Sequence, residues 1–344
     1  MAYTTINKST DYFNTKTWSG NNSTQSITGV GFAPDLVWTK ARNGANSHIW
    51  YDKVRGVHKY IRSDQTAAEG TATNTLTSFD SDGFTVGDGD NGNASGANGV
   101  AWNWKANGAG SSNTDGSITS TVSANTTSGF SVVTWTGNGS NGATIGHSLN
   151  SVPKMMIFKI LSSADDWTVY HSFLGAGKKL NLNNNDAEAT VAEIFNNTEP
   201  TSSLITFGTH SRTNTNGANY VGYIFAEKTG YSKFGSYTGN GNADGTFVYT
   251  GFKPAFVMIK ETNTNGTDWR MMDNKRSTFN LVDDRLFPNL NNVENTGDGY
   301  DFLSNGFKIR SSGGDFNGSG DSYIYMCFAE APLVGTNGVT AKAR

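Results

Sequence analysis

Residues 34–40 read PDLVWTK, and this short stretch decides the fold because its pattern occurs three times. A proline is followed six residues later by a lysine, with mostly apolar residues between them. The pattern returns as PKMMIFK at 153–159 and PAFVMIK at 254–260. A short apolar run that opens on proline is typical of a β-strand, because the first residue of a strand needs no N–H donor. The chain is therefore read as copies of one strand-rich unit.

Further landmarks recur around this pattern in the same order. An aromatic residue with a polar-Gly-Asn turn precedes each copy, a tryptophan follows it, and an aromatic strand closes the unit. The turns are Trp18–Asn21, Trp135–Asn138 and Tyr237–Asn240, the tryptophans are Trp50, Trp167 and Trp269, and the closing segments are 100–104, 221–225 and 324–328. These repeats predict three units, at residues 1–110, at 111–229 with a divergent sequence, and at 230–344 with a C-terminal tail.

Alternation in the closing segments predicts antiparallel strands in an all-β fold. Val100, Trp102 and Trp104 share one face, and we expect Ala101, Asn103 and Lys105 on the other face to meet water. This pattern favours three tandem antiparallel β-sandwiches. The middle unit departs from the others, since it lacks their Asp-Gly or Asn-Gly hairpin and contains one predicted helix over 186–195.

Two features of the repeat invite a closer interpretation. The lysine that ends each pattern is interpreted as an edge-strand charge, with pairing to an acid near the following tryptophan as the alternative. The third closing strand carries apolar residues on both faces. We therefore expect its second face to be covered by a neighbouring unit or a second chain, which makes Tyr323, Tyr325 and Cys327 the candidate assembly contact.

Composition excludes several classes of function. The net charge is −3 without basic runs, which argues against a nucleic-acid partner. The single cysteine, Cys327, leaves no internal disulfide and no multi-cysteine metal site. No apolar run approaches the ~20 residues of a membrane span, and the N-terminus shows no secretion signal. We expect a soluble protein made in a cytoplasm, without a cofactor.

Motifs for catalysis are likewise missing from the sequence. The acids lie mostly in turns, without the carboxylate pair of a glycosidase, and the five histidines have no metal-ligand spacing. We therefore predict a protein that is not an enzyme. Oxygen ligands for calcium are present in one loop, although the glutamate that closes an EF-hand is missing; this weak metal candidate comprises Asp88, Asp90, Asn91 and Asn93.

Tryptophans offer a route to glycan binding, because an exposed indole can stack on the apolar face of a sugar. Most tryptophans in such units fill cores, and that interpretation competes with stacking for each residue. The candidates for glycan stacking are Trp18, Trp38, Trp50 and Trp135.

The repeat text resembles a known family. Segments such as GFAPDLVWTKARN, NTLTSFDSDGFTVG, GVAWNWKANG and YIYMCFAEAPLVGTN are similar to repeats in structural proteins of tailed bacteriophages, especially marine ones. The resemblance covers nearly the whole chain. It implies jelly-roll or concanavalin-like sandwiches in a tail-fibre-like virion protein, and it carries over no catalytic residues.

From the resemblance we expect assembly in the host cytoplasm and a final location on the virion. The expected partners are other virion proteins of the capsid or tail, and a host-surface glycan. The chain has no heptads, which favours a short fibre, a knob or a capsid decoration that forms a homo-oligomer such as a trimer. The alternatives are a lectin-like receptor-recognition tail protein and an envelope-glycan hydrolase.

Overall fold

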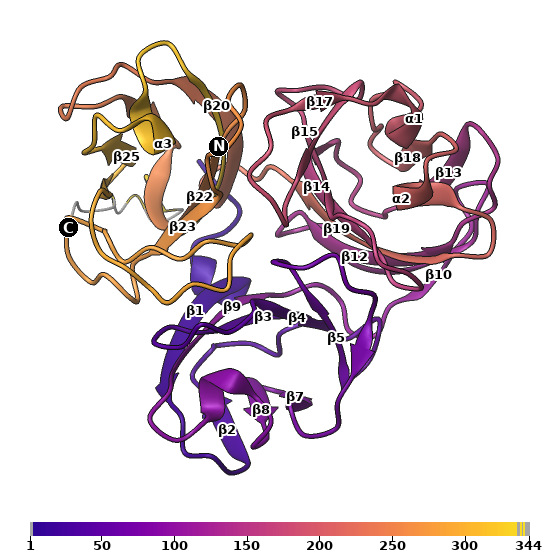
Figure 1. Ribbon diagram of the computed structural model, residues 1–344, viewed down its shortest axis with the longest axis horizontal. Coiled ribbons are helices and arrows are strands. Elements are labelled where there is room, and N and C mark those ends of the chain that lie inside the picture. The colour runs from indigo at the N-terminus through magenta and orange to yellow at the C-terminus, as the bar shows by residue number, and fades with distance from the viewer. Residues whose placement is uncertain (1–2, 336–337, 339, 341–344) are drawn as a thin grey trace.

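A computed structural model describes residues 3–335, 338 and 340. It is 43% strand and 5% helix with several antiparallel sheets, so the all-β prediction is confirmed. Figure 1 shows three bodies arranged around a common centre, in chain order from indigo to yellow. We call them region 1 (residues 9–106), region 2 (residues 111–226) and region 3 (residues 231–332). In each region a larger sheet faces a smaller one.

Region 1 begins with the 3-10 turn η1 (Ser9–Asp11). Its smaller sheet has the order β2 (Gln25–Thr28), β8 (Gly83–Val86) and β7 (Leu76–Asp80). Its larger sheet has the order β1 (Phe13–Ser19), β9 (Asn98–Trp104), β3 (Leu36–Ala41), β4 (Ile49–Asp52), β5 (Lys59–Arg62) and β6 (Gly70–Thr71).

Region 2 has the widest sheet, because two strands are added before β12. Its smaller sheet pairs β13 (Ala143–Gly146) with β18 (Leu204–Phe207). The larger sheet has the order β10 (Ser111–Asn113), β11 (Ser120–Asn125), β12 (Phe130–Thr136), β19 (Asn219–Ala226), β14 (Pro153–Ile160), β15 (Thr168–His171), β16 (Lys178–Asn181) and β17 (Ala189–Thr190).

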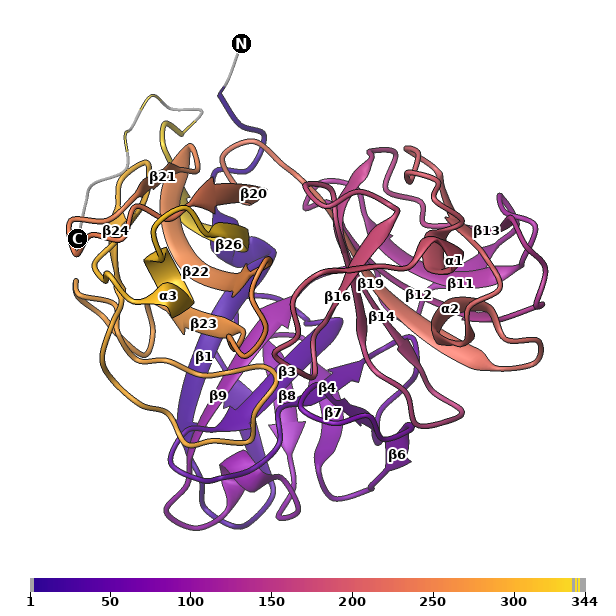
Figure 2. The same ribbon diagram turned by 45° about the horizontal axis from the view of Figure 1, so that its top comes forward.

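Region 3 repeats the arrangement with fewer strands. Its larger sheet has the order β20 (Ser232–Thr238), β26 (Ser322–Pro332), β22 (Phe252–Glu261) and β23 (Arg270–Asp273), and its smaller sheet has the order β21 (Phe247–Tyr249), β25 (Gly306–Ile309) and β24 (Tyr300–Leu303). The turned view in Figure 2 shows that β22 of region 3 and β14 of region 2 both lie next to the strands of region 1. The predicted C-terminal tail falls partly on residues 336, 337, 339 and 341–344, which lie outside the described residues.

In the part of the chain that the structure describes, helical structure is limited to single turns. Besides η1 these are η2 (Asn91–Asn93), α1 (Ala192–Phe195), α2 (Ser211–Asn214) and α3 (Gly314–Asn317). The predicted helix over 186–195 is wrong except for its last four residues. Ala189 and Thr190 form β17, which pairs with β16, so this part of the segment is a strand. Val191 precedes α1 and provides no side-chain cap.

Each region encloses its own apolar core between the two sheets, and a fourth core lies where the regions meet. In region 1 the local core joins Ile27 and Phe84 of the smaller sheet to Val37 and Ala101 of the larger one. The fourth cluster, here called the central core, takes side chains from the opposite faces of the three larger sheets. From the closing strands it contains Val100, Trp102 and Trp104, Val221, Tyr223 and Phe225, and Ile324, Met326 and Phe328.

The central core corrects the expectation of a wet face on the closing strand. Ala101 and Asn103 are both fully buried, Ala101 within the local core, while Trp102 and Trp104 enter the central core. A strand covered on both faces is normally recognised by a continuous apolar run. The polar Asn103 and Lys105 hid this arrangement in the sequence.

The repeated lysines also depart from expectation. Lys40, Lys159 and Lys260 lie in strands paired on both sides and are buried, so they are not edge charges. Each ammonium group donates to the carbonyl oxygen of the next residue, at 2.5, 2.8 and 2.6 Å respectively. Burial lowers the pKa of each lysine to about 8, although nearby carboxylates oppose this shift.

Candidate functional site

Contacts between the regions use one repeated position, the last residue of β4, β15 and β23. The indole nitrogen of Trp102 in region 1 donates to Asp273 of region 3 at 3.0 Å. The hydroxyl of Tyr223 in region 2 donates to Asp52 of region 1 at 2.8 Å. His171 of region 2 completes the ring, with Nε2 at 3.4 Å from the carbonyl oxygen of Tyr325 in region 3. The three regions are therefore joined head to tail in a closed ring.

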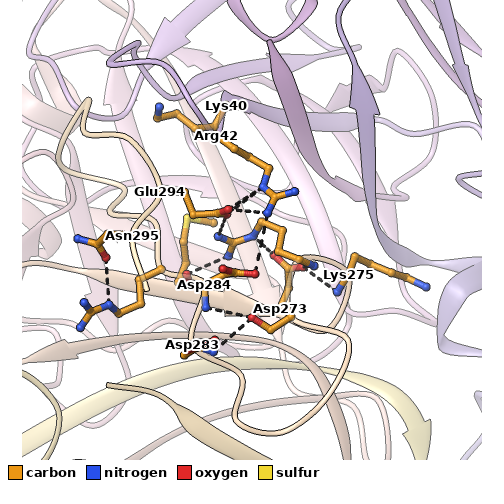
Figure 3. Close-up of polar contacts among 12 residues, drawn as sticks. Lys40, Arg42, Asp273, Lys275, Asp283, Asp284, Glu294 and Asn295 are labelled. Atoms are coloured by element: carbon orange, nitrogen blue, oxygen red, sulfur yellow. Dashed lines mark hydrogen bonds and ion pairs between the residues drawn. The ribbon is translucent and has the colours of Figure 1, made fainter. Parts of the chain in front are cut away.

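A charged network holds regions 1 and 3 together (Figure 3). Arg276 donates to Asp273 at 2.6 Å and to Glu294 at 2.8 Å, and both Arg276 and Asp273 are buried. Arg42 of region 1 donates from Nε to both oxygens of Glu294 at 2.8 and 3.0 Å. Burial acts to lower the pKa of Arg276, but Asp273 and Glu294 outweigh it, so the pKa is raised. This arginine stays charged and depends on its partners.

A similar network faces region 2. Asp52 lies 2.5 Å from Nε of Arg55, and Glu69 lies 3.3 Å from Nη1 of the same side chain. The remaining Arg55 donor, Nη2, bonds to the carbonyl oxygen of Trp50 at 2.9 Å. Lys59 lies 3.4 Å from the second oxygen of Glu69. Both carboxylates are therefore neutralised within region 1.

Next to this network lies a cavity of about 530 Å³ between regions 1 and 2. It is found where the central-core face of β12 runs beyond the central core. Phe130 and Val132 on that face are buried in the central core, while Thr134 and Thr136 further along line the cavity. Region 1 supplies the opposite wall with Val54, Arg55 and Glu69.

Hydroxyl groups dominate the wall that region 2 contributes. Ser112, Thr121 and Thr134 are cross-strand neighbours on β10, β11 and β12, so their hydroxyls form a row. Within the described residues no protein group bonds to these three hydroxyls. Thr136 instead donates to the side chain of Asn219 at 2.9 Å. The cavity therefore offers several free donors and acceptors; its other lining residues from region 2 are Thr119, Ser120, Trp135, Leu161, Ser162 and Tyr220.

A smaller cavity of about 170 Å³ occupies the corresponding place between regions 1 and 3. Thr15 and Thr17 of β1 line it, as the equivalents of Val132 and Thr134, and Lys275 faces them from region 3. β1 is an edge strand of its sheet, with no counterpart of β10 and β11 beyond it. The two extra strands are what widen the cavity beside region 2.

The tryptophans expected to stack on glycans are mostly unavailable. Trp38, Trp50 and Trp135 are only 1%, 1% and 4% exposed, because the first two lie in the central core and the third in the core of region 2. The indole nitrogen of Trp135 donates to the carbonyl oxygen of Thr213 at 3.0 Å. Trp18 is half-buried and packs edge-on against Phe84. Core packing, the competing interpretation, accounts for these residues.

The predicted assembly contact is also enclosed. Tyr323, Tyr325 and Cys327 face the smaller sheet of their own region and belong to its local core. Their exposures are 0%, 4% and 0%, so these side chains are not available to a second chain. The expectation of a strand covered on both sides was sound, but the cover comes from β21, β24 and β25 on one face and the central core on the other.

The weak calcium candidate does not form a site. Asp88 is exposed and accepts from Asn74 at 2.9 Å, whereas Asp90 is buried and accepts from the backbone of Gly92 at 2.8 Å. Burial raises the pKa of Asp90 to about 6. Asn91 is exposed, and Asn93 turns into the protein interior. Among residues 3–335, 338 and 340, no cluster of three or more His, Cys, Asp or Glu side chains is arranged for a metal.

A buried asparagine that the sequence analysis missed organises each region. Asn93, Asn214 and Asn317 end η2, α2 and α3, and each accepts from the backbone of the Asn in the repeated turn. Each also donates to two backbone carbonyl oxygens or more in adjacent loops. Aligning the three copies residue by residue would have revealed this recurring Asn a few residues before each closing strand.

Comparison with known protein families gives a match that covers all three regions. A family model described as Domain of unknown function (DUF7483) matches residues 8–332. No curated protein and no solved structure gives a significant match. Within the described residues, no helix has the length and apolar character needed to span a bilayer.

Proposed function

The chain belongs to the DUF7483 family, and we propose that it is a non-catalytic structural protein of a tailed-phage virion. In this role it forms a compact, surface-exposed knob, short fibre or capsid decoration that binds another virion protein or the host surface. The proposal rests on the resemblance of its repeats to phage structural proteins. We further propose that the three regions are tandem jelly-roll or concanavalin-like sandwiches, matching residues 1–110, 111–229 and 230–344.

The closed ring of regions is the observation that supports this role best. Every region contacts both others through the central core, so no region is left as a separate, freely hinged module. Such a body transmits little internal motion and keeps its outer loops in fixed relative positions. A particle component that binds a partner without catalysing a reaction needs its binding loops held in fixed positions. It does not need the mobile lid that many enzymes close over a substrate.

Particle composition and cryo-electron microscopy test the proposal. We expect the protein in purified virions of its phage, with density that fits the three-region body at the tail or on the capsid. Density at the tail tip, with adsorption blocked by the purified protein, would identify host attachment. Density on capsid faces would identify decoration. Absence of the protein from purified particles would refute the virion role.

A second candidate is a carbohydrate-binding, receptor-recognising tail protein. The hydroxyl-lined cavity between regions 1 and 2 is the specific observation in its favour. An envelope-glycan hydrolase is less well supported at this cavity, because glycosidases use two carboxyl groups. Glu69 is the one carboxylate among the described residues that line it, and it is paired with Arg55 and Lys59.

Self-association is the third part of the proposal. A homo-oligomer, with a trimer as the expected state, cannot use Tyr323, Tyr325 or Cys327, because these side chains are buried. Light scattering coupled to size-exclusion chromatography at micromolar concentration measures the state directly. A trimer mass supports the expectation, and a monomer mass would restrict oligomerisation to the particle.

A further inference from the structure

We propose that the cavity between regions 1 and 2 binds a neutral saccharide, with the hydroxyl row of β10, β11 and β12 as its principal contact. This inference deepens the carbohydrate-binding candidate above and rests on it. It assigns a place and a ligand charge that the repeat pattern does not reveal. Trp38 and Trp50, which are buried in the central core, do not line this cavity.

The sheet face that forms this wall is apolar elsewhere. Along β12 it begins with Phe130 and Val132 in the central core, and the neighbouring strand β19 adds Val221 and Tyr223. Beyond them the same face turns to Thr134, Thr136 and Asn219. Since a larger central core would bury apolar residues here, the change to hydroxyls marks a surface built to remain wet.

The hydroxyls extend over two strands that, among the described residues, only region 2 contains. β10 and β11 are added to the edge of β12, whereas the equivalent strands β1 and β20 stay at the edges of their sheets. Ser112 and Thr121 on these added strands continue the row begun by Thr134. The result is a cavity of about 530 Å³, in place of the 170 Å³ found between regions 1 and 3. That volume falls in the range of ~300–1,000 Å³ typical of ligand sites.

Among the described residues, the cavity presents no exposed cationic group to a ligand. Arg55 is the only guanidinium that lines it; the Arg55 side chain is 2% exposed, and its three nitrogens donate to Asp52, Glu69 and the carbonyl oxygen of Trp50. An anionic ligand would therefore find no exposed cation to offset the loss of its hydration. A neutral ligand does not incur that cost.

Among neutral ligands, a saccharide matches the chemistry of the lining. A sugar hydroxyl both donates and accepts hydrogen bonds, and so do the free hydroxyls of Ser112, Thr121 and Thr134. A wholly apolar ligand would bury these hydroxyls without partners, which is costly. Val54 and Leu161 line the same cavity and offer apolar contact for the C–H face of a sugar ring. The lining therefore matches a molecule with hydroxyl edges and apolar faces.

Saturation-transfer NMR on the purified full-length protein provides the test. The probes are methyl glycosides of glucose, galactose, mannose and N-acetylglucosamine, their disaccharides, and glucuronic acid as the anionic comparison, each at millimolar concentration. We expect saturation transfer to at least one neutral probe and none to glucuronic acid. Backbone amide shifts induced by the bound probe should be centred on residues 112, 119–121, 134–136 and 162.

Variants then tie binding to the hydroxyl row. Thr121→Val with Thr134→Val removes two hydroxyls while keeping side-chain shape, and should weaken binding about tenfold, since hydrogen bonds of this kind contribute modestly one by one. Thr17→Val, at the equivalent of Thr134 on β1, is the matched control and should leave affinity unchanged. Ser162→Trp, which fills the cavity, should abolish binding. Equal melting temperatures of the variants and wild type show that folding is intact.

Several outcomes would overturn the inference. These are no saturation transfer to any neutral probe, equal transfer to glucuronic acid, unaltered affinity in the double valine variant, or amide shifts confined to other surfaces. Failure here is separable from failure of the virion role. Particles that contain the protein while no probe binds would remove only the saccharide inference, and probe binding in the cavity by a protein absent from particles would remove only the virion proposal.

Discussion

The contacts that regions 1 and 3 make through Asp52 and Asp273 differ in chemistry from the contact that region 2 makes through His171. The two aspartates each hold a buried arginine three residues later, Arg55 or Arg276. At the corresponding places region 2 has His171 and Leu174, and Leu174 packs against the central core. One position of the repeat thus supports both an ion pair and a neutral pair.

This difference teaches that the ring needs a hydrogen-bonding group at this position but does not need a charge. Two desolvated ions lose hydration, and their attraction only roughly compensates for that loss. The neutral contact avoids the cost and still closes the ring. Charge at the other two contacts nonetheless makes them more sensitive to the removal of a single partner.

Removing one partner of a buried ion pair should have the largest effect on stability. Asp273→Asn takes the anionic partner from buried Arg276, leaving only Glu294, and should lower the free energy of unfolding by about 3–5 kcal/mol. His171→Gln, at the neutral contact, should cost about 1 kcal/mol. Denaturant unfolding followed by tryptophan fluorescence measures both. Equal losses for the two variants would contradict the contrast between charged and neutral contacts.

Acid should have the second largest effect, because it weakens the contact through His171. Burial lowers the pKa of His171 to about 4, with Lys154 acting in the same direction. An unfolded histidine titrates near 6.5. Between these values the unfolded chain binds a proton that the folded protein excludes, so stability is complete above about pH 6.5 and falls by up to roughly 3 kcal/mol towards pH 4.

Stability curves of wild type and His171→Gln from pH 7 to pH 4 check this expectation. The variant should lose less stability on acidification. His48, whose pKa burial also lowers, remains in both proteins and keeps part of the slope. Parallel curves would show that His171 is not the group that titrates.

Replacing the ion pair of region 1 with the neutral pair of region 2 should have the smallest effect on stability. Asp52→His together with Arg55→Leu places the neutral pair of region 2 in region 1, and should change the free energy of unfolding by less than about 2 kcal/mol. Arg55→Leu alone leaves Asp52 buried without its cation, and should cost more. A double variant less stable than the single one would show that the site requires its ion pair.

Much of the fold was predictable from local pattern. The repeated apolar stretches, the closing strands and the first and third hairpins are all strands in the structure. In each hairpin the glycine opens the second strand, because Asp80 pairs with Gly83 and Leu303 with Gly306. The prediction of a helix over 186–195 failed because part of this segment pairs as strand β17 with β16, and its weak helical pattern does not outweigh that pairing. Local propensity yields to tertiary pairing in such segments.

The candidate site was far less predictable. Ser112, Thr121 and Thr134 are ordinary strand residues, and nothing in their spacing marks them as neighbours of Arg55 and Glu69. Their proximity depends on how region 2 meets region 1. The aromatic residues that looked suited to sugar binding are buried because the same meeting of regions encloses them.

By itself the sequence determined the all-β class and the repeated order of strands, since alternation and turn residues act over a few positions. Only the tertiary structure decided which faces are buried. Residues 34–40 illustrate the division: their pattern predicts a strand, but the arrangement of three sheets places Trp38 and Lys40 on the side of the central core. Burial depends on contacts between distant segments, and a local pattern cannot specify them.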